Sequence, residues 1–297
     1  MKTPPFLKRG DTIAIVAPAK SIEVEHIEYA RIFWEKRGYK VLLGENLLGN
    51  HHYFSGTEQE RFSDFKMALN NDEVKAVICA RGGYGCVQIL DMINWAGMLD
   101  EPKWVVGFSD VTFFHQHLNY MEVESLHASM PLNYKGNSKE ALDSLVGTLE
   151  GKFIEYNWKS KHAKEGKTEG KLLGGNLSIV HSLLGSDSQP DYRNSILYLE
   201  EVGEHLYAID RMFYALEKNG VLNKISGLVI GGMTSISDTN PGFGASLDEM
   251  VLKHFRFRKI PIAFDFMAGH IDDNRALRLG ANYSLEIESK NCSLRLK

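Results

Sequence analysis

Ser109 has the setting in this 297-residue chain that most invites a chemical question. It lies in the stretch VVGFSDVT, residues 105–112, where an apolar strand-like run ends and a helix-like run begins. A strand-turn-helix transition presents a side chain at the carboxyl edge of a parallel sheet, where open α/β folds place their sites. A serine there serves as a helix N-cap or as a nucleophile. Taken alone, the stretch favours the cap, because Val111 stands where the elbow motif G-x-S-x-G has its second glycine.

A nucleophilic serine needs a base, commonly an imidazole that a carboxylate holds in place. Among the eleven histidines, His270 is the best placed, because it follows the expected strand 262–266 through a short loop. Glu200 and Glu201 end another apolar run, ILYL at 196–199. Neighbouring strand residues point to opposite faces, so we expect one acid to face a shared site and the other to meet solvent or a salt-bridge partner. A solvated loop histidine and acids that only end a strand remain the alternatives.

Other residues with reactive or metal-binding side chains give weaker signals. His115 and His117 lie two residues apart on one expected helix, about 200° around its axis, so they cannot bind one metal together. Cys79, Cys86 and Cys292 form no CxxC pair, which favours reduced thiols, and we expect Cys86 to be a buried filler rather than a nucleophile. We therefore expect no metal and no cofactor.

The loop RGGYG at 81–85 follows an expected strand and is the best source of donors for an oxyanion. Its glycines let backbone N–H groups approach a ligand closely. The same loop would also suit a phosphate, but neither of the common nucleotide-binding glycine motifs is present. Arg81, Gly82 and, further along the chain, Asn176 are expected to contact a substrate, the arginine and the asparagine because their side chains suit free carboxylates.

The elements that must position these residues form two α/β units, in agreement with a chain length that favours two domains. In the first unit, short β-branched runs alternate with amphipathic segments, the pattern of a doubly wound parallel sheet. The expected strands are 12–16, 40–43, 75–80 and 104–107, and the expected helices are 23–37, one capped by Thr57, 87–95 and 110–118.

The second unit repeats this pattern after a polar, lysine-rich stretch that we interpret as a linker. We expect domains at 1–134 and 171–297, joined by a linker at 135–170. The expected elements of the second unit are a helix from Asn176 to 184, strands 195–201 and 227–232, and a helix at 206–218. The tail LRLGANYSLEIESKNCSLRLK alternates with period two and predicts a terminal hairpin.

Composition excludes several classes of protein. The chain is 43% hydrophobic and 24% charged, with a net charge of −4, which gives no reason to expect nucleic acid or a membrane as a partner. The N-terminal stretch lacks a continuous apolar core before Lys8 and Arg9, and no run of about eighteen apolar residues follows. We expect a cytoplasmic protein.

Several short stretches, in their order and spacing, together resemble the serine LD-carboxypeptidase family, which includes muramoyl-tetrapeptide carboxypeptidases and microcin C self-immunity peptidases. They are IAIVAP at 13–18, FSGTEQER at 54–61, RGGYG at 81–85, GFSD at 107–110, LLGGNLSIV at 172–180, ILYLEEVGEHLYAIDRM at 196–212 and GH at 269–270. The resemblance spans nearly the whole chain. One departure is HASM at 127–130, where many relatives have HGPM.

The resemblance implies a catalytic triad of Ser109, Glu200 and His270. It also implies an oxyanion hole made by the backbone N–H groups of Gly83 and Asp110. The family fold has an N-terminal α/β domain with the serine and a C-terminal α/β domain with the glutamate and histidine, so the active site is expected in the cleft between the domains. A homodimer is expected on the same ground.

The function implied is release of a C-terminal D-alanine from L-Lys or meso-diaminopimelate of murein tetrapeptides, through an acyl-enzyme, in peptidoglycan recycling. One alternative keeps the triad but makes the substrate a peptidyl-nucleotide antibiotic, for which Trp158 would be the aromatic platform. Another, from a different class, is a non-catalytic α/β protein whose glycine loops bind phosphate or sugar.

Overall fold

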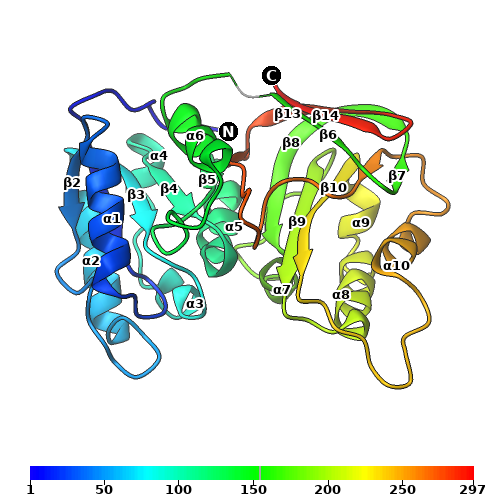
Figure 1. The fold of residues 1–297 in the computed structure, drawn as a ribbon, viewed down its shortest axis with the longest axis horizontal. Coiled ribbons are helices and arrows are strands. Elements are labelled where there is room, and N and C mark those ends of the chain that lie inside the picture. Colours follow the sequence, from blue (N-terminus) through cyan, green and yellow to red (C-terminus); the bar gives the residue numbers. More distant parts are fainter. Residues whose placement is uncertain (154) are drawn as a thin grey trace.

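The computed structural model describes residues 1–153 and 155–297, which form two lobes, each built on its own sheet (Figure 1). The sheet of the first lobe has the strand order β12-β5-β4-β3-β1-β2. All its neighbours are parallel except β12, which is antiparallel to β5. The strands are β1 (Thr12–Val16), β2 (Lys40–Leu43), β3 (Val74–Cys79), β4 (Trp104–Gly107), β5 (Ser125–His127) and β12 (Leu277–Leu279).

Helices cover both faces of this sheet, as the doubly wound pattern predicts. The helices α1 (Val24–Glu35) and α6 (Lys139–Leu149) share one apolar core with one face of the strands, and α2 (Glu58–Asn70), α3 (Cys86–Leu90) and α5 (Thr112–Tyr120) share another with the opposite face. Thr57 caps α2 as predicted, in a reciprocal pair of hydrogen bonds with Glu60. The expected helix at 87–95 is shorter, because it ends at Leu90 and is followed by the separate turn α4 (Gly97–Asp100).

The second lobe has an eight-stranded sheet of order β6-β14-β13-β8-β9-β10-β11-β7. Its central strands β8 (Gly166–Asn176), β9 (Ile196–Val202), β10 (Gly227–Thr234) and β11 (Ile262–Ala263) are parallel, and antiparallel strands flank them. One face of the sheet packs against α7 (Leu177–Ser182), α8 (Leu206–Lys218), α9 (Val221–Lys224) and α10 (Leu247–His254). Both lobes are therefore α/β.

The structure differs from the expected linker at 135–170. That segment contains α6, β6 (Glu155–Lys159), β7 (Ala163–Lys164) and the first part of β8. In β6 only Tyr156 and Trp158 point inward, and an antiparallel strand with one solvated face needs no more apolar residues than that. The lysine-rich composition therefore marks a surface strand, and no long connection separates the lobes.

The tail forms the predicted hairpin, with β13 (Asn282–Glu288) antiparallel to β14 (Asn291–Leu296). Its first residues behave differently, because LRL at 277–279 is the strand β12 and pairs with β5 of the first lobe. The chain thus passes from the first lobe to the second, returns for one short strand, and ends in the second (Figure 1).

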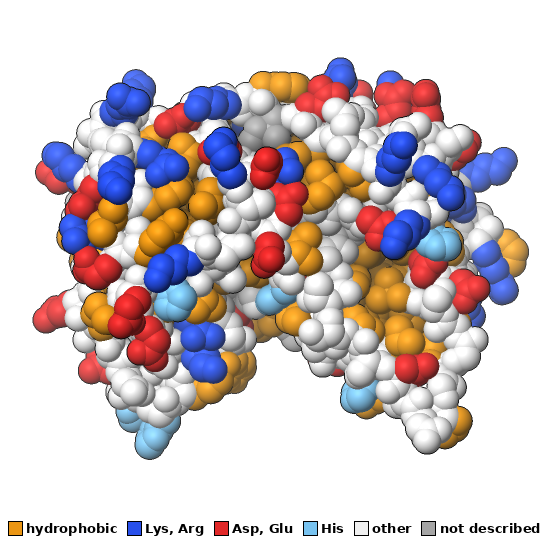
Figure 2. Space-filling view, viewed as in Figure 1, with side chains coloured by type: hydrophobic (Ala, Val, Ile, Leu, Met, Phe, Trp, Pro, Cys, Tyr) orange, Lys and Arg blue, Asp and Glu red, His pale blue; other side chains and the backbone are white. Residues whose placement is uncertain are grey.

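Figure 2 shows positive and negative side chains interspersed over both lobes and a notch between the lobes at the lower edge. Within the described part of the chain, no helix is long and apolar enough to cross a membrane.

Candidate active site

Ser109 occupies a strained turn directly after β4. Its φ is 62°, in the left-handed region that residues other than glycine seldom adopt. Ser109 is the first residue of the short 3-10 helix Ser109–Val111, and α5 follows. The N-cap positions of these helices are Phe108 and Val111, and neither makes a side-chain cap, so the capping interpretation of Ser109 is wrong. A Cβ built on Gly107 would lie 2.8 Å from Val111 Cγ2, so one glycine before the serine makes room for the valine after it. The turn is an elbow although the second glycine of the motif is missing.

The Ser109 side chain instead contacts His270 of the second lobe. Ser109 Oγ lies 3.1 Å from His270 Nε2, and His270 Nδ1 lies 2.7 Å from Oε2 of Glu200. Glu200 belongs to β9 and is fully buried, whereas His270 lies in the loop after β11. Three side chains that are 70 and 161 residues apart in sequence therefore form one hydrogen-bonded line across the two lobes.

The electrostatics of this line assign the histidine tautomer. Because the buried Glu200 carboxylate accepts the Nδ1–H of His270, Nε2 is left to accept the Ser109 hydroxyl proton. Burial lowers the pKa of His270. The hydrogen bond to Glu200 and the charges of Glu200 and Glu201 raise it, and together they outweigh burial, so the pKa is above its ordinary 6.5. His270 is thus tuned as a stronger base than a free imidazole.

Glu201 is shielded from solvent and has no cationic partner among residues 1–153 and 155–297, so the prediction that the second acid meets solvent or a salt-bridge partner is wrong. It is buried, and it accepts hydrogen bonds from Asn176 Nδ2 at 3.0 Å and from the backbone N–H and hydroxyl of Ser178 at 2.8 and 2.7 Å. The reason is that Glu201 points to the face of β9 that the helices cover, so this acid meets the start of α7. The Asn176 amide also caps α7 by accepting Ile179 N–H, which leaves it engaged within the protein.

The loop 81–85 packs directly against the serine. A Cβ built on Gly82 would lie 2.9 Å from Ser109 Cβ and 3.3 Å from Asp110 N, so only glycine allows this approach. Gly83 has a φ of 112°, and a Cβ there would meet the Tyr53 hydroxyl at 3.0 Å. The expected oxyanion donors, Gly83 and Asp110, are therefore neighbours of Ser109 on two different segments.

Two buried charged side chains hold this loop, and the sequence analysis missed both. Asp110 Oδ2 accepts the N–H of Cys86 at 2.7 Å, whereas we considered only the backbone N–H of Asp110. Arg61 Nη1 donates to the carbonyls of Gly85 and Pro18 at 2.9 and 2.8 Å. Burial raises the pKa of Asp110, and the Cys86 N–H opposes this. One sequence feature could have indicated that Arg61 is buried. It lies four residues before the apolar Phe65, so both residues lie on the inward face of α2.

The remaining candidates have structural partners. Arg81 Nη1 donates to Ser21 O at 2.9 Å, which ties the loop to the segment after β1. Cys86 is fully buried, and burial raises the pKa of its thiol well above 9, so it is no nucleophile. Trp158 Nε1 donates to Phe264 O at 2.8 Å, and its ring packs on Phe266.

The histidine pair on α5 is likewise structural. His115 contacts the Ser125 hydroxyl and the Gly107 carbonyl, both at 2.9 Å, and burial lowers its pKa to about 4. His117 contacts the Ser188 hydroxyl at 2.8 Å. Among the residues that the structure describes, no three His, Cys, Asp or Glu side chains are arranged to hold a metal ion.

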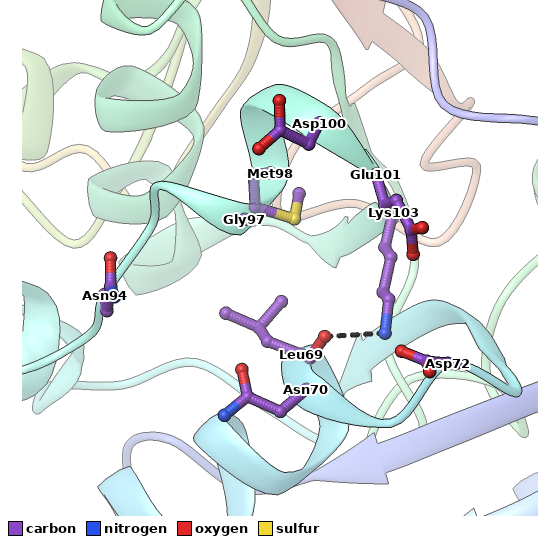
Figure 3. A pocket seen from close by; sticks show the side chains of 9 residues that line it. All are labelled: Leu69, Asn70, Asp72, Asn94, Gly97, Met98, Asp100, Glu101 and Lys103. Carbon is purple, nitrogen blue, oxygen red and sulfur yellow. Dashed lines mark hydrogen bonds between the residues drawn. The ribbon is translucent and has the colours of Figure 1, made fainter.

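A cavity in the first lobe lies away from this site (Figure 3). Its lining comes from the end of α2, the segment around the turn α4, and Lys103, which lies directly before β4. Lys103 Nζ donates to Leu69 O at 2.6 Å and to Asn71 O at 2.6 Å, which are carbonyls at the C-terminal end of α2. This arrangement stabilises a helix end and offers no nucleophile.

Comparison with known proteins agrees with the two-lobed geometry. Residues 13–128 match the model of the LD-carboxypeptidase N-terminal domain, and residues 169–285 match that of the LD-carboxypeptidase C-terminal domain. Ser109 lies in the first match, and Glu200 and His270 lie in the second.

Individual relatives cover nearly the whole chain. A probable murein peptide carboxypeptidase from Bacillus subtilis is 30% identical over 294 residues, which cover 97% of this chain and 92% of the relative. The crystal structure of muramoyltetrapeptide carboxypeptidase from Oxalobacter formigenes superposes with a TM-score of 0.88 at 28% identity, covering 96% of this chain and 98% of that one. The microcin C7 self-immunity protein of Escherichia coli is 23% identical over an alignment 322 positions long, which covers 96% of this chain and 93% of the relative.

Proposed function

The chain belongs to the LD-carboxypeptidase family, a family of peptidases, and we propose that Ser109, Glu200 and His270 are its catalytic triad. The observation that carries the proposal is the hydrogen-bonded line from the Ser109 hydroxyl through His270 to the buried Glu200 carboxylate. The left-handed backbone of Ser109 supports it, because such strain persists where the surroundings impose a functional geometry.

In the proposed reaction, Ser109 Oγ attacks the carbonyl carbon of the scissile bond while His270 Nε2 takes the hydroxyl proton. Glu200 holds the imidazole and stabilises its cation. The backbone N–H groups of Gly83 and Asp110 bind the oxyanion, each contributing on the order of 3 kcal/mol to the barrier reduction. His270 then gives the proton to the leaving amine, and water activated by the same histidine hydrolyses the acyl-enzyme.

The proposed substrate is a murein tetrapeptide, from which the enzyme releases C-terminal D-alanine at L-Lys or meso-diaminopimelate. Support comes from the names of relatives that cover the whole chain. Lys20 is a candidate partner for a substrate carboxylate that the sequence analysis did not identify. Its ammonium lies 4.8 Å from the Tyr53 ring centre, and a Cβ on Gly83 would lie 3.1 Å from Lys20 Cβ, so Lys20 borders the proposed oxyanion hole.

We further propose that the protein acts in the cytoplasm as a homodimer, recycling peptides from the cell wall. Light scattering of the purified protein tests the dimer. A mass of 33.5 kDa at all concentrations would contradict it, because that is the mass of one chain.

The decisive experiment incubates the protein with L-Ala-γ-D-Glu-meso-Dap-D-Ala and with its L-Lys counterpart, and measures free D-alanine. We expect release from at least one peptide, and loss of release in Ser109→Ala. A matched control is Ser182→Ala, because Ser182 is an exposed serine on α7 that bonds only a local carbonyl. Release that persists in Ser109→Ala would refute the proposed nucleophile.

A second candidate is a peptidyl-nucleotide immunity peptidase, favoured by the match to the microcin C7 self-immunity protein. Trp158 is packed against Phe266 and donates to Phe264 O, so its ring is not available to stack on a nucleobase. The two functions are distinguished by measuring cleavage of aminoacyl sulfamoyl adenosine and of the murein peptides side by side. Only an immunity peptidase is expected to cleave the adenosine compound faster than it releases D-alanine. Tight binding of phosphate or sugar without turnover of any peptide would favour the non-catalytic alternative.

A further inference from the structure

Behind the proposed triad lie two buried polar groups that have an unused hydrogen-bonding atom. Among the described residues, the buried side-chain atoms without a partner include Nδ2 of Asn274 and Nδ1 of His127. Both residues are at least nine-tenths buried, with exposed fractions of 1% and 0%. A buried donor and a buried acceptor left unpaired are costly, so two of them in one region call for an explanation.

Asn274 anchors the loop that carries His270. Its Oδ1 accepts the N–H of Gly269 at 2.8 Å, and Gly269 directly precedes His270. The loop has little freedom at this point, because Gly269 has a φ of 115° and a Cβ there would lie 2.8 Å from Glu200 Cβ. Asn274 therefore fixes the backbone from which the histidine side chain projects.

His127 belongs to the other lobe, beside the strand that leads to Ser109. It is on β5, in register with Gly107 of β4, two residues before the serine. The Phe108 ring packs between His127, at 5.7 Å, and His270, at 4.9 Å. Nε2 of His127 lies 3.4 Å from the Tyr198 hydroxyl. His127 therefore packs directly against the backbone and side chain that lead to Ser109.

The protonation of His127 is set by its surroundings. Burial lowers its pKa well below 6.5, as do the nearby His115 and His270 rings, while the Asn274 side chain acts in the opposite direction. Asn274 lies close to this ring, because its carbonyl accepts the Ser129 hydroxyl at 3.4 Å and Leu277, further along the same segment, pairs with His127. The ring is therefore neutral, with one donor nitrogen and one acceptor nitrogen. Because Nε2 faces Tyr198, the atom left for Asn274 is Nδ1.

We propose that Asn274 is a positioning residue for the reaction, which links the His270 loop of the second lobe to His127 of the first. Its Oδ1 holds Gly269 N–H, its Nδ2–H donates to His127 Nδ1, and His127 Nε2–H points to the Tyr198 hydroxyl. The amide thereby fixes the distance between His270 Nε2 and Ser109 Oγ. This inference rests on the proposed role of Ser109 as the nucleophile.

The first test measures the nucleophilicity of Ser109 without any murein substrate. A fluorophosphonate reacts when Ser109 Oγ bonds to phosphorus and fluoride leaves, with the hydroxyl proton passing to His270. We expect Asn274→Ala to lower this rate by roughly 10- to 100-fold, since a misplacement of about 1 Å has that effect, and to lower kcat for D-alanine release similarly with little change in KM.

The matched control is Asn119→Ala. Asn119 is equally buried, and its amide also bridges to the returning segment through Leu279 O, but it lies away from His270. We expect it to lower Tm while the phosphonylation rate per folded molecule stays at the wild-type value. If Asn274→Ala behaves in the same way, Asn274 is only structural and the inference is wrong.

The second test determines which nitrogen of His127 carries the proton, from the 15N chemical shifts of its ring. The signals of His127 are identified by their loss in His127→Gln. The wild type is expected to carry the proton on Nε2. In Asn274→Asp, an oxygen still accepts Gly269 N–H but another faces Nδ1, so the proton is expected to move to Nδ1. The same tautomer in both proteins overturns the inference. A wild type that no fluorophosphonate labels refutes the proposed nucleophile, and the tautomer then still decides the role of Asn274.

Discussion

At the scale of single residues, the site combines a strained serine with a fully buried carboxylate. The left-handed backbone of Ser109 makes its hydroxyl project from the elbow. Glu200 is buried away from water, and its carboxylate orients His270 by binding Nδ1. A buried carboxylate is tolerated where a strong donor meets it, and His270 supplies that donor at 2.7 Å. Burial lowers the pKa of His270, and Glu200 is the main group that raises it above the ordinary value.

The pH dependence of turnover follows from this raised pKa. His270 must be neutral to accept a proton, so kcat/KM should rise with pH along a limb whose apparent pKa lies above 6.5. Glu200→Gln removes the charge that raises the pKa of His270, so the limb should move to lower pH while kcat falls on the order of 10⁴-fold. Glu217→Gln on α8 is the control and should leave the profile in place. A limb that does not move in Glu200→Gln would contradict the proposed role of the carboxylate.

Arg61 gives a second prediction at this scale. Because its guanidinium holds the carbonyls of Gly85 and Pro18, Arg61→Met should loosen the loop 81–85. We expect kcat/KM for D-alanine release to fall by up to roughly 100- to 1000-fold, the range for a lost oxyanion donor. Arg31→Met, which breaks an exposed ion pair with Glu28 and Glu35, should change activity little. Equal activity of the two variants would show that the loop needs no such clamp.

The residues of the proposed triad were predictable, because strand ends and short motifs are visible in a linear sequence. The side-chain roles of Asp110, Arg61 and Asn274 were not. Arg61 and Gly85 are 24 residues apart, and Asp110 and Cys86 are also 24 apart, so only the folded chain shows which backbone group each side chain meets. Asn274 meets Gly269 nearby, but its contact with Ser129 of the other lobe, and the proposed contact with His127, depend on the whole topology.

At the scale of elements, the end of α2 depends on Lys103, which lies directly before β4 (Figure 3). Lys103 donates to carbonyls that the helix itself leaves unpaired, and its side chain is nearly buried, with an exposed fraction of 6%. A lysine here performs the task that a glycine C-cap performs elsewhere.

Lys103→Met should therefore lower the free energy of unfolding by about 1–3 kcal/mol, because buried carbonyls lose their donor. The measurement is urea denaturation. Lys75→Met is the control, since Lys75 donates only to the exposed Asp72 O, and its effect should stay within about 0.5 kcal/mol. Proposed activity should survive in both variants. Equal stability of the two would mean that water satisfies the end of α2.

Elements with local signals were predicted well, and elements defined by a distant partner were not. Thr57 and Glu60 form a capping box at the start of α2, and this motif is visible in the sequence, so the start of the helix could be predicted. In contrast, β6 is a strand because β14 lies beside it, and its partners Cys292 and Leu294 are far along the chain. Composition alone made that strand look like a linker.

At the scale of the whole molecule, the two lobes are joined by more than their connecting segment. The strand β12 belongs to the first sheet although residues on both sides of it belong to the second lobe. At a second contact, a Cβ on Gly175 of β8 would lie 2.7 Å from Thr112 of α5, so glycine permits the lobes to approach. Sequence reasoning found two α/β units but not this exchange, because the pairing of three residues leaves no periodic signal.

We expect the lobes to unfold together. Trp34, Trp95 and Trp104 lie in the first lobe and Trp158 in the second, so fluorescence of Trp158→Phe reports the first lobe alone. Its urea transition should coincide with the transition that far-UV circular dichroism reports for all helices and strands. Two separated midpoints would show that β12 does not couple the lobes.

The return of β12 also has a consequence for biosynthesis. A domain at the start of a chain usually folds while the ribosome is still making the rest. Here the first sheet remains incomplete until residues 277–279 emerge, so β5 keeps an unpaired edge during most of translation. His270 emerges just ahead of that strand. The nascent chain therefore closes its first sheet and brings the histidine to Ser109 in the same late step, and a product of synthesis interrupted before residue 270 lacks one member of the proposed triad.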